Sequence, residues 1–327
     1  MRIVTLEEHL TFPELTSQIP KEIMDSHSID NSPAIQYLMP KLKDITGERL
    51  QSMAANGITL QVLSVSGAGA DLLDPSEGPA FARKYNDEIA AKIAEHRLRF
   101  AAFAHLPMTA PNEAADELER TITLHGFKGA LINGLTNEKF LDDPEFAPIL
   151  QRAERLDVPI YLHPGLPPKA VADAYYSNLP KISGMFLSIA GWGWHSETAL
   201  HVLRLIVSGT FDRYPKLKLI IGHMGEMLPM MMARCDNALR PGLVGDNSRS
   251  VVETLRAQVF ITTSGIFTNP PLATAIDTFG IDNMMFSVDY PYASNEQGKA
   301  FLDKAPLSVA DTKKLAHENA DKLLKLS

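Results

Sequence analysis

The stretch MRIVTLEEHL (residues 1–10) contains the pattern on which the assignment of the fold depends. Its apolar and β-branched residues 3–6 predict a strand that becomes buried. Side chains alternate between the two faces of a strand, so Glu7 and His9 share one face and Glu8 takes the other. The strand therefore ends with two potential metal ligands side by side. An isolated Glu-x-His is more often a solvated strand end, and the rest of the chain decides between these interpretations.

Seven further apolar stretches follow, and sequences with a helical pattern separate them. The eight strands expected in this way are IVTLEEH (3–9), ITLQVLSV (58–65), RFAAFAHL (99–106), FKGALING (127–134), VPIYLHPG (158–165), LKLIIGHMG (217–225), VFITTSG (259–265) and NMMFSVDYP (283–291). Helical patterns between them include 79–96 and 111–126, the second with acidic residues in its first turns and Gly126 as its stop. Alternation of strands and helices predicts an α/β protein. The number of strands favours a (β/α)8 TIM barrel over a doubly wound open sheet.

The uniform composition of the chain along its length indicates its domain organisation. No low-complexity linker, repeat or change of composition divides the 327 residues, so we predict a single domain over residues 1–327. Two connections are unusually long, namely 10–48 after the first strand and 164–195 after the fifth. Long loops on the C-terminal side of barrel strands commonly form a pocket wall or a lid. The aromatic and apolar content of 164–195 favours that role over a surface insertion.

Composition limits the partners and the compartment. The net charge is −8 and the pI is about 5.7, which argues against nucleic acid or an anionic membrane as the main partner. A single cysteine, Cys235, excludes an intrachain disulfide and fits a reducing compartment. The chain does not start like a secretory signal and contains no long apolar run. We therefore expect a soluble, cytoplasmic protein.

Polar side chains stand at the C-terminal ends of several predicted strands. In a barrel these ends converge on one mouth, where active sites are built. The set combines one glutamate, three histidines and one aspartate, which suits Zn²⁺, Mn²⁺ or Fe²⁺: Glu7, His9, His163, His223 and Asp289. Any one of them would be weak evidence, because a lone buried histidine is more often a hydrogen-bonded core residue. Their common position at matching strand ends predicts a metal site.

Several motifs, in order along the chain, resemble a known family. They are LEEHL (6–10), YLHPG (161–165), GHMGE (222–226) with LPMMMAR (228–234), ITTSG (261–265) and FSVDYPY (286–292). This combination resembles the amidohydrolase-2 group of the amidohydrolase superfamily. Within that group the chain looks most like the γ-resorcylate and 2,3-dihydroxybenzoate decarboxylases, which remove CO2 from ortho-hydroxylated aromatic acids. The resemblance covers essentially the full length.

The resemblance implies roles for individual residues. It implies a mononuclear site with Glu7, His9, His163 and Asp289 as ligands, in which Asp289 also handles the proton. His223 and Glu226 match residues that lie beside the substrate and assist the aspartate. Arg234 matches an arginine on the acid-binding side of the site, although a helical arginine followed by Asp236 could equally be a solvated pair.

The sequence departs from related metal enzymes at two positions, and these differences bear on the number and kind of metal ions. The predicted strand 127–134 ends in Asn133 and supplies no bridging lysine of the kind that holds two metals in binuclear relatives. Glu7 stands where many relatives have a histidine, and a hard carboxylate tilts the site towards Mn²⁺ or Mg²⁺. We therefore expect one divalent ion, with Mn²⁺ or Zn²⁺ as the first candidates and Mg²⁺ as a further one.

The reaction implied is nonoxidative decarboxylation, which must place a proton on the ring carbon that carries the carboxylate. We expect Asp289 to be protonated at the start, with a pKa raised by a dry pocket and by nearby carboxylates. Asn133, Tyr292 and Trp194 are candidates for the substrate-binding wall, although buried aromatic residues more often belong to the core. The resemblance further implies a homo-oligomer and a small aromatic acid as the partner, and it leaves the physiological direction open.

Two other functions remain as alternatives. The same barrel could act as a metal-dependent hydrolase of a lactone or an ester. A catalytically idle barrel that serves as a scaffold is the third hypothesis, and the intact set of candidate ligands argues against it.

Overall fold

All eight predicted strands are present in the computed structural model, which describes residues 1–22, 33–67 and 69–326. The strands are β1 (Val4–Leu10), β2 (Leu60–Val65), β3 (Phe100–Ala102), β4 (Ala104–His105), β5 (Ala130–Asn133), β6 (Ile160–His163), β7 (Leu219–Ile221), β8 (Val259–Thr262) and β9 (Met284–Met285). The third predicted strand, 99–106, is interrupted at Phe103, so that β3 and β4 are its two halves. Short apolar runs between helical patterns thus located the strands.

The strands form two parallel sheets in the order of the sequence. One sheet has the order β1-β2-β3 and the other the order β4-β5-β6-β7-β8-β9. The predicted barrel is therefore present as two sheets of parallel strands that meet at the interrupted third strand, and strand pairing does not close it between β9 and β1. The reason lies in β9, which pairs with β8 through only Met284 and Met285.

Beyond β9 the chain is held to β1 largely by side chains. The Ser287 hydroxyl accepts hydrogen bonds from the backbone N–H groups of Leu6 and Glu7. The N–H of His9 donates to the carbonyl of Tyr290 at 2.7 Å. These contacts bring the last strand region against the first without a regular ladder.

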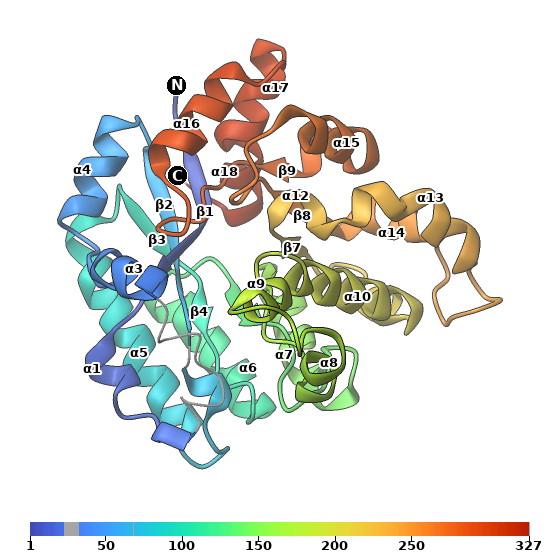
Figure 1. Ribbon diagram of the computed structural model, residues 1–327, viewed down its shortest axis with the longest axis horizontal. Coiled ribbons are helices and arrows are strands. Elements are labelled where there is room, and N and C mark those ends of the chain that lie inside the picture. The colour runs from blue at the N-terminus through green and yellow to red at the C-terminus, as the bar shows by residue number, and fades with distance from the viewer. Residues whose placement is uncertain (23–32, 68, 327) are drawn as a thin grey trace.

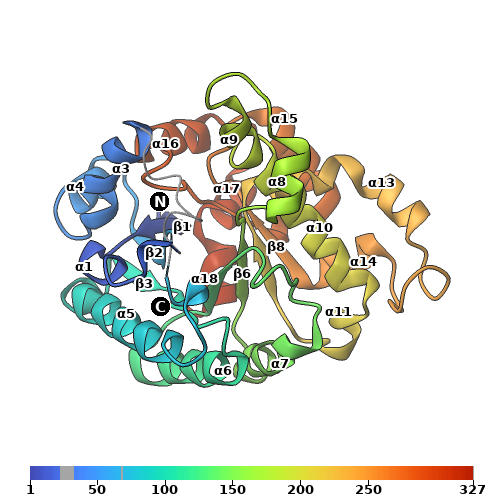
Figure 2. The same cartoon turned by 60° about the horizontal axis from the view of Figure 1, so that its bottom comes forward.

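Helices cover the outside of the strands, as Figures 1 and 2 show. In the N-terminal half they are α1 (Pro13–Thr16), α3 (Pro33–Lys43), α4 (Glu48–Ala55), η1 (Ala70–Leu72), α5 (Gly78–Ile93), η2 (Ala94–His96), α6 (Pro111–Arg120), η3 (Thr121–His125), η4 (Pro144–Phe146) and α7 (Ala147–Leu156). In the C-terminal half they are α8 (Lys169–Tyr175), α9 (Ser183–Ser188), α10 (Gly193–Val207), α11 (Thr210–Arg213), α12 (His223–Glu226), α13 (Leu228–Ala238), α14 (Val251–Gln258), α15 (Asn269–Phe279), η5 (Ile281–Asn283), α16 (Asn295–Lys304), α17 (Val309–Lys313), η6 (Lys314–Glu318) and α18 (Asn319–Leu324). None of the helices in the described ranges has the length and apolar character needed to cross a membrane.

The two long predicted connections are not plain loops. The segment 10–48 contains α1 and α3, and its residues 23–32 lie outside the described part of the chain. The segment 164–195 contains α8, α9 and the start of α10. Local helical propensity was hidden there by the prolines and glycines that separate these short helices.

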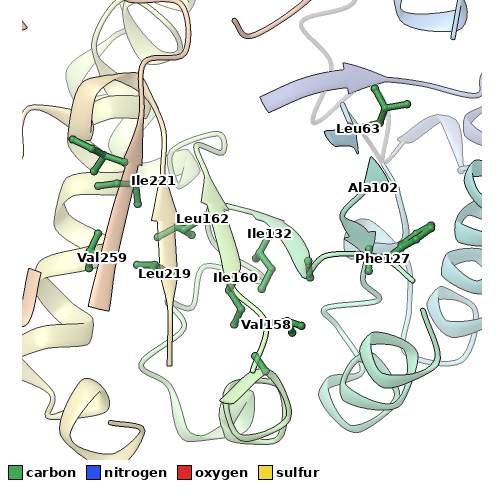
Figure 3. Close-up of a cluster of buried hydrophobic side chains, with 14 of the residues drawn as sticks. Leu63, Ala102, Phe127, Ile132, Val158, Ile160, Leu162, Leu219, Ile221 and Val259 are labelled. Carbon is green, nitrogen blue, oxygen red and sulfur yellow. The ribbon is translucent and has the colours of Figure 1, made fainter. Parts of the chain in front are cut away.

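Two apolar clusters explain why the strands stay together. Alternate strand residues pack outward against the helices; Figure 3 shows Leu63, Ile132, Leu162, Ile221 and their neighbours in this cluster. The intervening residues point the other way and form a second cluster that draws on strands of both sheets: Val4, Leu6, Leu60, Val62, Ala101, Phe103, Leu131, Tyr161, Ile220 and Met285. Residues Ala320, Leu323 and Leu324 of α18 join this second cluster. The α18 helix lies near the start of the chain, because Arg2 forms an ion pair with Asp321 at 3.0 Å.

Candidate active site

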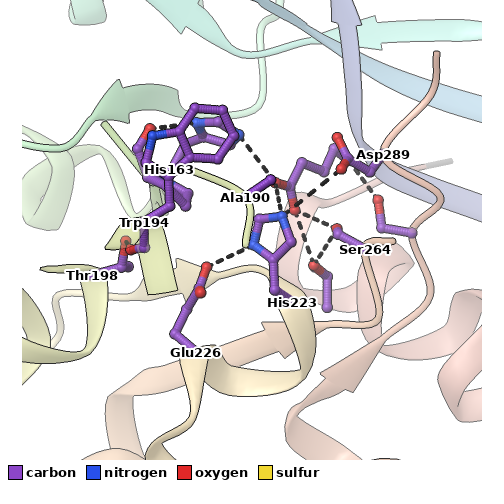
Figure 4. Close-up of polar contacts among 12 residues, drawn as sticks. His163, Ala190, Trp194, Thr198, His223, Glu226, Ser264 and Asp289 are labelled. Atoms are coloured by element: carbon purple, nitrogen blue, oxygen red, sulfur yellow. Dashed lines mark hydrogen bonds and ion pairs between the residues drawn. The ribbon is translucent and has the colours of Figure 1, made fainter. Parts of the chain in front are cut away.

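Polar side chains converge where β1, β6, β7 and β9 end. Figure 4 shows His163, His223 and Asp289 facing one another, with Glu226 beside His223. Glu7, His9 and His163 each offer a ligand atom, and these atoms lie within 4.8 Å of one another. The convergence follows from parallel strands whose C-terminal ends lie on the same side. The sequence-based prediction that these strand ends meet is therefore confirmed in its geometry.

Glu7 is fully buried, and its two carboxylate oxygens have different surroundings. Oε2 accepts hydrogen bonds from the hydroxyl groups of Tyr161, Thr262 and Ser264. Oε1 forms no hydrogen bond with any described residue, and it lies 3.3 Å from Nε2 of His163. Three hydroxyl groups thus fix the orientation of the carboxylate and leave one oxygen free for another partner.

The two histidines of the cluster are oriented so that their Nε2 atoms face inward. His163 donates from Nδ1–H to the carbonyl of Pro164 at 2.8 Å, which leaves Nε2 as the atom with a free lone pair. His9 places Nδ1 3.3 Å from the hydroxyl of Ser64, and its Nε2 is buried without a hydrogen bond to any described residue. Burial lowers the pKa of His163 to about 4, so its imidazole is neutral at pH 7, as a metal ligand must be.

These observations test whether the residues fit a divalent ion. Two buried polar atoms, Glu7 Oε1 and His9 Nε2, form no hydrogen bond with a described residue, although buried polar atoms are normally hydrogen-bonded. Asp289 Oδ1 lies 3.2 Å from His9 Nε2, which adds a second carboxylate to the same cluster. A mixed set of two carboxylates and two imidazoles is suited to Mn²⁺ or Zn²⁺. The residues therefore fit one divalent ion.

Asp289 is held in place by Glu8, which was not among the predicted site residues. Glu8 accepts hydrogen bonds from the N–H groups of Val288 and Tyr290, on either side of Asp289, at 3.0 and 3.1 Å. Asp289 itself has a positive φ of 72°, a conformation that aspartate tolerates better than most residues. The side chain of Glu8 thus fixes the turn that aims Asp289 into the cluster.

The neighbours of His223 and Asp289 shift the pKa values of these two groups in opposite directions. Burial by itself would raise the pKa of Asp289, but the neighbouring imidazoles of His223 and His9 outweigh it and lower the pKa to about 2. Burial disfavours the charged form of His223, yet the carboxylates of Glu226 and Glu7 raise its pKa well above the ordinary value. The expectation of a raised pKa for Asp289 is therefore wrong, because the nearby histidines were not counted.

Glu226 supports His223 from the side that faces away from the cluster. Its Oε1 atom lies 2.7 Å from Nδ1 of His223, and its carboxylate is fully buried. The Nε2 atom of His223 faces Asp289 Oδ2 at 3.8 Å and Glu7 Oε1 at 3.6 Å. Residues 223–227 form a tight turn in which His223, Met224 and Glu226 all have positive φ. This turn presents both side chains of GHMGE to the site.

The predicted substrate-binding residues lie at different distances from this cluster. Asn133 ends β5 directly beside His163 in the strand register. The ring of Tyr292 lies 5.5 Å from that of His9, and the Tyr292 hydroxyl contacts Ser66 at 2.6 Å. The ring of Trp194 lies 6.2 Å from that of His163. Arg234 is exposed on α13, and the structure of this chain does not bring it to the cluster.

His195 was not among the site residues predicted from the sequence. Its Nδ1 lies 2.6 Å from Oε2 of Glu226, so that Glu226 lies between two histidines. His195 follows Trp194 in the first turn of α10, and no strand pattern marks it. The only available signal was its place at the end of the long connection 164–195. The hydroxyl groups that donate to Glu7 were not predicted either, although Thr262 and Ser264 alternate within the quoted motif ITTSG.

Comparisons with known proteins agree with this geometry. The decarboxylase orsB of Emericella nidulans is 36% identical over 332 residues, which cover 99% of this chain and 97% of that protein. The γ-resorcylate decarboxylase of Rhizobium sp. strain MTP-10005 is 35% identical, with 99% and 98% covered. The crystal structure of a dihydroxybenzoic acid decarboxylase from Polaromonas sp. JS666, with bound manganese and the inhibitor 2-nitroresorcinol, superposes with a TM-score of 0.87 at 34% identity. It covers 99% of this chain and 97% of that one.

The family assignment rests on the whole chain. The sequence model of the amidohydrolase family (Amidohydro_2) matches residues 24–326. This range includes β2 to β9 and therefore His163, His223, Glu226 and Asp289. Together with relatives above 30% identity over nearly the full length, the match settles the membership. The chain belongs to the amidohydrolase family.

Proposed function

We propose that this protein is a metal-dependent nonoxidative decarboxylase of an aromatic acid that carries a hydroxyl group ortho to the carboxylate. The observation that carries the proposal is an acid–base pair, His223 and Asp289, directly beside the metal-type cluster of Glu7, His9 and His163. Relatives above 30% identity that are decarboxylases of dihydroxybenzoates support the reaction type and the substrate class.

The cation that fits the cluster would be held by Glu7 Oε1, His9 Nε2, His163 Nε2 and a carboxylate oxygen of Asp289. When bound, a divalent ion supplies positive charge that fixes the carboxylate and the adjacent hydroxyl oxygen of the substrate and lowers the pKa of that phenol. Manganese in the Polaromonas structure supports Mn²⁺ as the first candidate, and the donor set also suits Zn²⁺ or Mg²⁺.

The chain's own residues supply the proton. His223 carries it, with Glu226 fixing the ring through Nδ1 and leaving Nε2 directed towards Asp289. We infer that Asp289 receives this proton and donates it to the ring carbon that bears the carboxylate. The carbon–carbon bond then breaks, its electron pair returns to the ring, and CO2 leaves. Positioned acids of this kind contribute about 10²–10⁴-fold to rates.

Residues around the cluster would form the wall against which the aromatic ring packs. Tyr292 and Trp194 flank His9 and His163 from opposite segments of the chain. The indole Nε1–H of Trp194 is buried and forms no hydrogen bond with a described residue, so it is available to an oxygen of the substrate. Asn133, beside His163, is the candidate for a second polar contact. Arg234 can take part only if α13 or another subunit brings it near.

The proposal also covers the domain architecture, the oligomeric state and the location of the protein. One apolar cluster contains residues of both sheets, which supports a single (β/α)8 barrel domain over residues 1–327. Exposed apolar side chains on α8, α9 and α13, among them Tyr175, Phe186 and Met230, support a homo-oligomer. The single cysteine supports a cytoplasmic location.

The substrate class is tested by a panel of hydroxybenzoates. We expect the manganese-loaded protein to release CO2 from 2-hydroxybenzoate or 2,6-dihydroxybenzoate and to leave 3-hydroxybenzoate and 4-hydroxybenzoate unchanged. Only the ortho acids present two adjacent oxygens to one cation. CO2 release is followed with a pH indicator, and the phenolic product by chromatography, with the metal-stripped protein as control. Equal turnover of the 3- or 4-hydroxy acids would reject this chelation, and hydrolysis of a lactone or ester without any CO2 would favour the alternative hydrolase.

A further inference from the structure

A buried arginine contacts both chain segments that supply the candidate metal ligands. Arg49 comes from α4, and it is 0% exposed. Its Nη2 atom donates a hydrogen bond to the backbone carbonyl of His9 in β1. Its guanidinium carbon Cζ lies over the ring of Tyr290, 4.7 Å from the ring centre. Tyr290 directly follows Asp289 in the chain, so one guanidinium group joins the end of β1 to the turn after β9.

The contacts of Arg49 complete the fixation of the His9 backbone. The N–H of His9 donates to the carbonyl of Tyr290 at 2.7 Å, and the carbonyl of His9 accepts from Arg49. The peptide groups on both sides of His9 are therefore held by hydrogen bonds. Because a side chain starts from the backbone, this fixation limits the positions that the His9 imidazole can take.

Arg49 also belongs to the buried network that holds Asp289. Gln61 of β2 lies between Arg49 and Glu8: its Oε1 is 3.5 Å from Nη1 of Arg49, and its Nε2 is 3.4 Å from Oε2 of Glu8. Glu8 in turn accepts hydrogen bonds from the N–H groups on either side of Asp289. Three buried side chains from α4, β2 and β1 thus hold the backbone at two of the candidate ligands, His9 and Asp289.

A role of Arg49 as a direct anchor for the carboxylate of a substrate does not fit its surroundings. Its side chain is fully buried, and each of its three nitrogen atoms has an oxygen partner, namely the carbonyl of Asp44 for Nε at 3.0 Å, Gln61 for Nη1, and the carbonyls of His9 and Lys41 for Nη2. These acceptors are neutral oxygens. A buried charge carries a desolvation penalty that an apolar side chain of similar volume avoids, so core packing alone does not account for an arginine here.

We propose that Arg49 is a positioning residue of the metal centre. Its guanidinium group lies between the backbone of His9 and the ring of Tyr290, and it thereby sets the separation of His9 Nε2 from Asp289 Oδ1, which is 3.2 Å. A guanidinium suits this task because it donates in its plane while its flat face packs on an aromatic ring, whereas the ammonium of lysine is a point charge without a flat face. The inference rests on the proposed function, because it concerns the cation that this function requires.

The test measures Mn²⁺ affinity and requires no turnover. Arg49→Lys and Arg49→Met are compared with the parent after removal of metal, and free Mn²⁺ is quantified by electron paramagnetic resonance during titration. The matched controls are Arg99→Lys and Arg99→Met. Arg99 also donates to two backbone carbonyls, those of Thr59 and Ile58, both at 3.0 Å, but it precedes β3 at the opposite end of the strands. Circular dichroism gives the folded fraction, and urea unfolding gives the stability.

If Arg49 positions the ligands, both Arg49 variants bind Mn²⁺ about 10- to 100-fold more weakly than the parent while they are folded, as is typical when a group that orients metal ligands is lost. The Arg99 variants keep the parent affinity even where their stability falls. Parent affinity in the folded Arg49 variants would overturn the proposal and leave Arg49 a purely structural residue. An equal loss of affinity in the Arg99 variants would overturn it as well.

Tyr290 provides a second test if neither Arg49 variant folds. Tyr290→Leu removes the ring beneath the guanidinium and should weaken Mn²⁺ binding about tenfold, whereas Tyr290→Phe keeps the ring and should keep the parent affinity. Parent affinity in Tyr290→Leu would overturn the proposal. CO2 release by the parent is measured separately. A parent that binds Mn²⁺ and releases no CO2 rejects the proposed function but not the role of Arg49, and a parent that binds no Mn²⁺ rejects both.

Discussion

The carboxyl of Asp289 lies in surroundings that favour its ionised form. Its two oxygens face His9 and His223, at 3.2 and 3.8 Å, and these imidazoles lower its pKa although its side chain is only 16% exposed. An ionised Asp289 suits the proposed role as a ligand, and the raised pKa of His223 suits the proposed role as the group that holds the proton. Assigning metal binding and proton storage to different residues removes a conflict in the sequence-based mechanism, in which the same carboxyl group had to bind a cation and to stay protonated.

Replacement of Asp289 separates ligation from proton transfer. An amide can still coordinate a cation through oxygen, but it has no acidic proton to pass on. We expect metal-saturated Asp289→Asn to stay folded, to bind substrate and to turn over at least about a hundredfold more slowly. Steady-state kinetics at increasing manganese concentration provides the measurement. Recovery of near-normal turnover by excess metal would show that Asp289 is only a ligand, and His223 would become the direct donor.

His163 tests the metal site itself. Its side chain stands at the end of β6, orients Nε2 through the bond to Pro164 and contributes little to core packing. We expect His163→Ala to keep its fold and to lose most of its bound metal, whereas the parent holds one divalent ion per chain. Elemental analysis after dialysis gives the stoichiometry, and thermal unfolding gives the stability. Two ions per parent chain, or full metal content and activity in the variant, would contradict the assignment.

At the scale of elements, the sequence predicts the positions of strands but not the contacts between side chains that are distant along the chain. The strand ends could be located because short apolar runs between helical patterns identify buried strands, and parallel strands end on one side. Glu8 was set aside because its partners, Val288 and Tyr290, lie 280 residues away, and only the packing of β1 against the end of β9 brings them together. His195 was missed for the same reason: its contact with Glu226 depends on where α10 starts relative to the turn of GHMGE.

Helix α10 also carries a histidine with a structural role. His201 is buried, accepts a hydrogen bond from the N–H of Leu141 at 2.8 Å and packs against Phe140. Burial, assisted by the positive charge of Arg204, lowers its pKa to about 3. Arg204 is in turn paired with Asp142 at 2.9 Å. Protonation would remove the acceptor and place a charge in the core.

This histidine predicts a pH dependence of stability. The unfolded chain binds a proton at His201 below a pH of about 6.5, whereas the folded chain does not until about pH 3, so stability is complete above that range and falls as the pH decreases. The contribution lost at pH 5 is about 2 kcal/mol. We expect the drop in unfolding free energy between pH 7 and pH 5 to be smaller by that amount in His201→Gln, whose side-chain oxygen can still accept from Leu141. Equal drops in parent and variant, measured by urea unfolding, would contradict the shift.

At the scale of the whole molecule, the site depends on the junction between the two ends of the chain. Strand β1 supplies Glu7, Glu8 and His9, whereas Asp289 follows β9. The Ser287 hydroxyl joins β1 to the chain after β9, because it accepts hydrogen bonds from the N–H groups of Leu6 and Glu7. Helix α18 adds apolar side chains to the cluster between the strands. The number of strands and their order were readable from the sequence. The irregular junction was not, because side-chain hydrogen bonds and the single backbone bond from His9 to Tyr290 hold it in place of a regular ladder.

The central claim, that this molecule places a solvent-derived proton on the ring carbon as CO2 leaves, has a direct test. The manganese-loaded protein is incubated with 2,6-dihydroxybenzoate in D2O, and proton NMR and mass spectrometry are recorded on the product. We expect one deuterium in the resorcinol, at the carbon that carried the carboxylate, and no product from the metal-stripped protein. Unchanged acid, or a product with hydrogen at that carbon, would contradict the account.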